Sequence, residues 1–219
     1  MNRYDALRQP AAVSTDTLSK VLGLLGIAAL FTAAGALAAP GLGRTGFFIA
    51  LFGGLACVFI LPFAKERFPL NYILLYGFAT LEGIVLGSIV ELYVASGQGL
   101  LVLNAAAATG IVTLVAGGVG YTTKRDLSGM GGFLFIGLIA LIVTSVVGIF
   151  IHLAFLQLVI SAAGAVLFSA YLVFDLNRVA RAQNVSDGDA IVLAISVYLD
   201  IVNLFLYLLR LLGILGGRD

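Results

Sequence analysis

Residues 127–174 contain no Asp, Glu, Lys or Arg, and this stretch constrains the fold more than any other feature of the sequence. One helix crosses the hydrocarbon core of a bilayer in roughly 20 residues, so the stretch is about twice too long for a single span. It predicts two antiparallel helices that turn near His152. Lipid is the solvent that suits such a hairpin, because every backbone polar group bonds within a helix.

The composition of the whole chain agrees with a membrane protein. Of its 219 residues 61% are apolar and 11% are charged, whereas soluble domains carry roughly 25% charged residues. The net charge is +1 and basic residues never occur in runs longer than two, which argues against nucleic-acid binding. Cys57 is the one cysteine, so neither an intramolecular disulfide nor a structural zinc site of cysteines is expected.

Charged residues and Gly, Pro and Asn clusters divide the chain into seven apolar blocks, and the chain is predicted to be an all-α protein with seven transmembrane helices. The expected spans are residues 21–39, 46–64, 71–94, 101–121, 131–152, 156–179 and 189–212. They form one transmembrane domain, 18–219. Residues 1–17 hold charges of both signs and no apolar core, so they are expected to be a cytoplasmic segment and not a cleaved signal peptide.

The positions of the twelve Lys and Arg residues predict the orientation, because basic residues are retained on the cytoplasmic side. With a cytoplasmic N-terminus, nine of them fall on that side. They are Arg3, Arg8, Lys20, Lys65, Arg67, Lys124, Arg125, Arg178 and Arg181. Arg44, Arg210 and Arg218 fall on the other side. An alternative with six spans and a re-entrant last segment would return the last two to the cytoplasm.

Four acidic residues lie inside the predicted spans or at their ends: Glu82, Glu91, Asp175 and Asp200. A carboxylate near the bilayer centre costs at least about 2.5 kcal/mol, so it normally faces the protein interior or a water-filled path. Asp200 interrupts an otherwise apolar run and is the hardest to explain by packing. Glu82 is compatible with an ion path or with a structural hydrogen bond, whereas Glu91 lies where an interfacial residue is expected.

The last predicted span carries a polar stripe. Ser196, Asp200, Asn203 and Tyr207 are spaced by four, three and four residues, which places them on one face of a helix. Lipid offers hydrogen bonds to none of them, so the stripe is expected to face other helices or a pore. Ser196, Asn203 and Tyr207 of this stripe are candidate pore-lining residues, and so are Glu82 and Glu91.

Asp175 and Asp200 are expected to meet, because a short loop makes the last two helices antiparallel neighbours. Two carboxylates that share a site cannot both ionise cheaply, so they titrate as a coupled pair. Their oxygens also suit a hard cation such as calcium. Lys65 and Arg67 end the second span on the same side and either could neutralise the pair, although Asp175 could instead cap its helix or pair with Arg178.

Three segments resemble the Bax inhibitor-1 family, also called the transmembrane Bax inhibitor motif proteins. They are YTTKRDLSGMGGFLFIGLIALI, LFSAYLVFDLNRV and DAIVLAISVYLDIVNLFLYLLRLLG. The resemblance implies a seven-helix fold with the last helix surrounded by the first six. It also implies a pH-sensitive calcium leak in a bacterial plasma membrane, with Asp175 and Asp200 as the pH-sensing pair. A basic residue after the second span, Lys65 or Arg67, would act as a latch.

The leading functional hypothesis is therefore a passive cation leak, with calcium and protons as the partners and no cofactor. The alternative is a non-conducting protein that modulates membrane-protein quality control through a membrane protease or another membrane protein. An intramembrane aspartyl protease is disfavoured, because SVYLD before Asp200 lacks the expected Gly-x-Gly-Asp run. No enzyme activity is expected.

Overall fold

The computed structural model describes residues 15–151 and 153–216 and contains seven long helices. They are α1 (Thr15–Ala38), α2 (Gly43–Ala64), α3 (Leu70–Ala95), α4 (Gly99–Thr122), α5 (Gly131–Phe150), α6 (Ala154–Arg181) and α7 (Asp187–Gly216). Short 3₁₀ helices, η1 (Ala39–Gly41) and η2 (Ser128–Met130), precede α2 and α5. Each of the seven is long and apolar enough to span a membrane, which confirms the predicted architecture. The last of them, α7, is one continuous helix of 30 residues, as the seven-span prediction requires.

The uncharged stretch folds as the expected hairpin, since α5 ends at Phe150 and α6 begins at Ala154. The side-chain amide of Gln157, in the first turn of α6, donates a hydrogen bond of 2.7 Å to the carbonyl of Gly148 in α5. This bond ties the two helices together beside the turn. His152 itself lies outside the described residues, as do residues 1–14.

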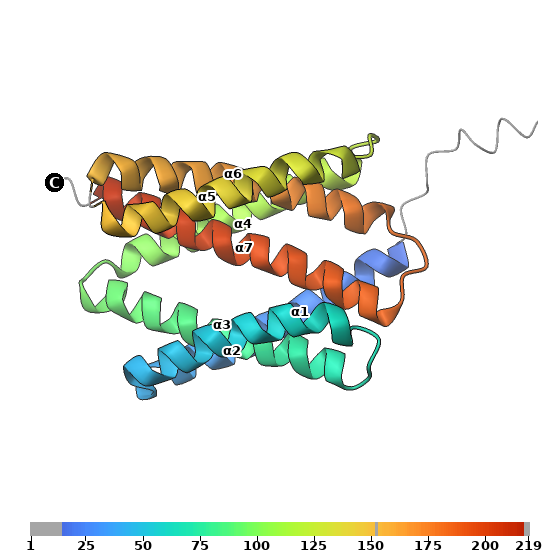
Figure 1. The fold of residues 1–219 in the computed structure, drawn as a ribbon, viewed down its shortest axis with the longest axis horizontal. Coiled ribbons are helices and arrows are strands. Elements are labelled where there is room, and N and C mark those ends of the chain that lie inside the picture. The colour runs from blue at the N-terminus through green and yellow to red at the C-terminus, as the bar shows by residue number, and fades with distance from the viewer. Residues whose placement is uncertain (1–14, 152, 217–219) are drawn as a thin grey trace, which may run out of the picture.

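The last helix is central, as expected. In Figure 1 it runs between a group formed by α1, α2 and α3 and a group formed by α4, α5 and α6. Half of the membrane-spanning part of α7 is buried, against 17–33% for the other six helices. It packs against α1, α3, α4 and α6, while α2 packs outside on α3 and α5 packs outside on α6. The polar stripe on α7 is therefore placed inside protein and not in lipid.

Helices α1 and α3 approach each other closely because glycines line their contact. A Cβ atom added to Gly83 would stand 2.1 Å from the carbonyl oxygen of Thr32, and one added to Gly35 would stand 2.1 Å from that of Thr80. Small residues at helix contacts permit such backbone approach in membranes, where no hydrophobic force drives helices together. The glycines in the third span thus serve packing.

The outer surface is apolar, as the bilayer requires. Large hydrophobic side chains such as Leu37, Phe63 and Leu114 are 79–87% exposed. In Figure 1 the α2–α3, α4–α5 and α6–α7 connections lie at one end of the bundle, together with the start of α1. We call this end the basic end. Of the nine Lys and Arg residues expected on the cytoplasmic side, those that the structure describes lie here.

Candidate intramembrane carboxylate site

Asp175 of α6 and Asp200 of α7 line one cavity of about 430 Å³. Both side chains are almost completely buried. The cavity lies between α5, α6 and α7. Its walls are Leu138, Ile142, Phe168, Tyr171, Asp175, Ser196, Leu199, Asp200, Asn203 and Tyr207. The structure thus brings together the two aspartates that the sequence singled out.

The polar stripe of α7 faces this cavity, since Ser196, Asn203 and Tyr207 line it with Asp200. The Ser196 hydroxyl donates to the carbonyl of Val192, and the Asn203 amide donates to the carbonyl of Leu199 at 2.8 Å. These local bonds use the serine hydroxyl proton and one of the two N–H groups of the amide. The Asn203 carbonyl oxygen, the hydroxyl oxygens and the carboxylates remain as oxygen ligands toward the cavity.

One oxygen of Asp200 has no hydrogen-bond partner among the described residues. It is the Oδ2 atom, and it is buried. An ionised carboxylate oxygen is costly in such a place unless a proton, a cation or a donor satisfies it. The unpartnered atom therefore marks the point of the cavity at which a proton or a cation would be held most favourably.

The basic partner of Asp175 is Arg178, one turn further along α6. The guanidinium donates a hydrogen bond of 2.7 Å to Asp175 Oδ1 and lies over the ring of Phe174, 5.6 Å from its centroid. The Arg178 side chain is 43% exposed while that of Asp175 is 6% exposed. Arg178 thus connects the buried aspartate to the surface, as one of the sequence alternatives anticipated.

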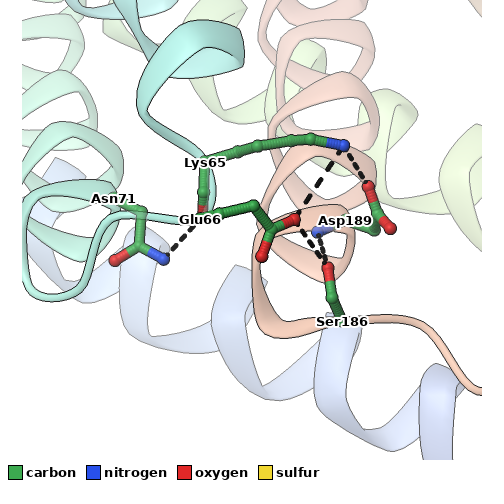
Figure 2. A network of polar contacts seen from close by, with 5 residues as sticks. All are labelled: Lys65, Glu66, Asn71, Ser186 and Asp189. Carbon is green, nitrogen blue, oxygen red and sulfur yellow. Dashed lines mark hydrogen bonds and ion pairs between the residues drawn. The ribbon is translucent and has the colours of Figure 1, made fainter.

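Lys65, the proposed latch, binds a different aspartate in this structure. Its Nζ lies 2.6 Å from Asp189 Oδ1 at the start of α7 and 4.0 Å from Glu66 Oε1 (Figure 2). The hydrogen bond and charge of Asp189 raise the pKa of Lys65 above its ordinary value. Arg67 is exposed in the α2–α3 turn. Within the described residues, neither Lys65 nor Arg67 forms a hydrogen bond or ion pair with Asp175 or Asp200.

Figure 2 shows how this lysine is embedded in a polar network between the α2–α3 turn and the start of α7. The Ser186 hydroxyl donates to Glu66 at 3.0 Å and accepts from the backbone N–H of Asp189 at 3.0 Å. The Asn71 amide donates to the Lys65 carbonyl at 2.8 Å. Lys20 of α1 pairs with Asp187 nearby. The start of α7 is therefore held by α1 and by the end of α2.

The two other acidic candidates lie apart from the Asp175–Asp200 cavity. Glu82 is partly buried on α3, near Tyr198, whose hydroxyl shares a 2.7 Å hydrogen bond with Thr32 on the α1 and α3 side of α7. Glu91 is exposed and lines a separate cavity with Arg44 at the opposite end of the bundle. Of the predicted pore-lining residues, the three on the α7 stripe share the cavity of the aspartates, whereas Glu82 and Glu91 do not.

Asn177 is a structural residue of this region that the sequence analysis did not single out. It is 1% exposed, and its amide donates to the carbonyls of Gly120 at 2.9 Å and Thr123 at 3.2 Å. Its oxygen accepts from the backbone N–H of Leu127 at 3.3 Å. It thereby fixes the end of α4 and the α4–α5 connection against α6. The sequence feature that could have identified Asn177 is an amide side chain two residues after Asp175 in a largely apolar helix.

Comparison with known proteins agrees with this arrangement. A family model described as inhibitor of apoptosis-promoting Bax1 matches residues 14–217. The chain belongs to the Bax inhibitor-1 family. The match covers all seven helices, including both aspartates, so the resemblance noted in the sequence is confirmed.

Members of the Bax inhibitor-1 family similar to this chain occur in bacteria and in a virus. An uncharacterized protein of Helicobacter pylori (strain ATCC 700392 / 26695) is 35% identical over 173 residues, 79% of this chain and 73% of the relative. An uncharacterized membrane protein of Vibrio cholerae is 38% identical over 143 residues, 65% and 63% of the two chains. The Golgi anti-apoptotic protein of vaccinia virus (strain Lister) is 34% identical over 168 residues, 75% and 67%. This chain is thus a multi-pass integral membrane protein with bacterial homologues.

Proposed function

We propose that this protein is a passive cation leak, calcium being the main ion, and that protonation of Asp175 and Asp200 gates it. One observation carries the proposal: two buried carboxyl groups share a cavity, and Asp200 Oδ2 there has no partner among the described residues. A carboxyl in this state responds to either a proton or a cation, so the same atoms can sense pH and contact the ion.

The ligands of the cavity suit transient calcium binding. Calcium takes six to eight oxygen ligands, and the cavity offers two carboxylates together with the oxygens of Ser196 and Asn203. Within residues 15–151 and 153–216 no three His, Cys, Asp or Glu side chains gather as a metal-binding cluster would. Water would supply the remaining ligands. Such a weak site favours passage of an ion over its storage.

Protonation would change the forces on α6 and α7. A neutral Asp175 binds Arg178 less strongly than a charged one does, and a neutral Asp200 no longer attracts a cation. Either change would favour one packing arrangement of α6 against α7 over another. A local change of charge can switch a pair of helices between two such arrangements. Lys65 would act as a latch by holding the start of α7 through Asp189.

The distribution of basic residues supports a cytoplasmic N-terminus in a bacterial inner membrane. Seven basic residues lie at the basic end, in the first turns of α1, in the α2–α3 and α4–α5 connections and in the last turn of α6: Lys20, Lys65, Arg67, Lys124, Arg125, Arg178 and Arg181. Retention of basic residues in the cytoplasm would place this end inside the cell.

The test is calcium flux into liposomes between about pH 5 and 8. We expect Asp200→Asn to abolish the pH response and Asp175→Asn to alter it, because each removes a titratable group from the cavity. Asp126→Asn, in the exposed α4–α5 connection, is the matched control and should behave as the wild type. Unchanged flux and pH response in Asp200→Asn would refute the proposal. If deletion of residues 1–17 then abolished the cellular role with flux intact, an interaction protein would be the better description.

A further inference from the structure

Two cavities lie along the same seam between α3, α4 and α7. The first, of about 330 Å³, is at the end of the bundle opposite the basic end and is lined by Leu92, Tyr93, Ser96, Gln98, Arg210, Gly213 and Ile214. The second, of about 490 Å³, is deeper and is lined by Leu86, Ala106, Thr109, Gly110, Thr113, Leu114, Ile201, Val202 and Phe205. In Figure 1 the connection between α3 and α4 lies at the same end as the close of α7.

The outer cavity has the chemistry of an anion site. Arg210 has no ion-pair partner recorded within the described part of the chain, and the nearest acidic residue on α3, Glu91, lines a different cavity. The Gln98 amide and the Tyr93 hydroxyl are further donors. The hydroxyl lies against α7, since a Cβ added to Gly213 would be 3.2 Å from it. A guanidinium flanked by neutral donors is matched to a phosphate group.

The deeper cavity has the chemistry of an acyl-chain site. Its walls are hydrocarbon apart from two threonine hydroxyls, and one of these, that of Thr109, already donates to the Ala105 carbonyl at 2.7 Å. Leu114 of this wall and the adjacent Ile111 are 79% and 63% exposed and so face lipid. Val202 of this groove lies two residues after Asp200, or about 200° around the helix, so the groove is on the far side of α7 from the carboxylate cavity.

The spacing of the two cavities matches one amphiphile. Gly213 of the outer cavity lies eleven residues beyond Val202 of the deeper one, which is about 16 Å along the helix and within about 20° of the same face. Half of the hydrocarbon core of a bilayer is roughly 15 Å thick, so a headgroup at Arg210 would leave its acyl chain beside Phe205.

We propose that a phospholipid binds in the seam between α3, α4 and α7, with its phosphate on Arg210 and one acyl chain in the groove beside Phe205. The occupant is a lipid and not a free anion because the polar and apolar cavities are arranged head to tail on the same three helices. The site is separate from the carboxylate cavity, so its occupancy can be tested independently of ion flux.

The experiment is native mass spectrometry of the delipidated full-length protein titrated with phosphatidylglycerol. Arg210→Gln should weaken lipid retention roughly tenfold or more, because charge-assisted hydrogen bonds are lost. Gly110→Leu should do the same by filling the groove, and a side chain can enter there because nothing lies within 4 Å of a Cβ on Gly110. The matched controls are Arg44→Gln, at the same end, and Gly118→Leu, on the same helix and equally free of contacts.

Wild-type retention in both Arg210→Gln and Gly110→Leu would overturn the proposal, as would an equal loss in the two controls. Inorganic phosphate added in excess should not displace the lipid. If phosphate did displace it and Gly110→Leu had no effect, the seam would hold only an anion site, which also contradicts the proposal. Thermal unfolding of each variant checks that lost binding is not lost folding.

Discussion

The Arg178 guanidinium donates a 2.7 Å hydrogen bond to Asp175, one helical turn earlier on α6. This bond places a permanent positive charge beside a buried carboxyl that shares its cavity with Asp200. The charge state of the pair therefore depends on a residue whose side chain is 43% exposed and reaches the surface of the protein.

Replacing Arg178 by glutamine should shift the pH response of calcium flux upward. Without the guanidinium less acid is needed to protonate the aspartates, since a neighbouring cation favours their charged form. The loss of a partly exposed partner should also lower the free energy of unfolding by about 1–2 kcal/mol. Flux between about pH 5 and 8 and thermal unfolding in detergent measure both effects. Arg125→Gln, exposed at the same end, is the control, and an unmoved pH midpoint in Arg178→Gln would contradict this role.

Replacing Lys65 by methionine should increase the flux without moving its pH midpoint. The pKa of Lys65 is raised above its ordinary 10.5, so the lysine stays charged and its contribution is lost only as the pH rises beyond that value. Its pairing with Asp189 is consequently constant over the range in which the leak is assayed. A shifted midpoint would show that Lys65 is part of the sensor. The double variant Lys65→Asp with Asp189→Lys should restore the wild-type flux.

Replacing Asn177 by alanine should destabilise the protein by about 2–3 kcal/mol. The change removes the amide's hydrogen bonds to the buried Gly120 carbonyl and to the Thr123 carbonyl, and it leaves the N–H of Leu127 without its acceptor. Thermal unfolding gives the stability, and hydrogen exchange should show faster exchange at Leu127. Asn104→Ala, at an exposed position of α4, is the control. Equal stability of Asn177→Ala and the wild type would mean that water replaces the amide without cost.

Replacing Gly83 by leucine should disrupt the contact between α1 and α3. A Cβ at this position would stand 2.1 Å from the Thr32 carbonyl oxygen, so the helices would have to separate. Overpacking of this kind costs about 1–3 kcal/mol or more. The yield of folded protein in detergent and its unfolding temperature are the measurements. Gly118→Leu, with open space around its Cβ, should be tolerated, and equal tolerance at Gly83 would show that this packing is not required.

Helix positions and the polar stripe followed from the sequence because they depend on local properties. Span length is set by bilayer thickness, and the spacing of Ser196, Asp200, Asn203 and Tyr207 is fixed by 3.6 residues per turn. The placement of Asp175 and Asp200 at one cavity was also within reach, since a short loop forces neighbouring helices together. These features needed no knowledge of how distant helices pack.

The choice of partner for each charge was decided only by the tertiary structure. Several basic residues share one end of the bundle, and the sequence does not say which of them meets which acid. Lys65 pairs with Asp189 because the path of α7 between the two helix groups brings its start beside the end of α2, whereas Arg178 pairs with Asp175 one turn away on the same helix. The sequence by itself determined what crosses the membrane and which face of α7 is polar, whereas long-range packing decided which side chains touch.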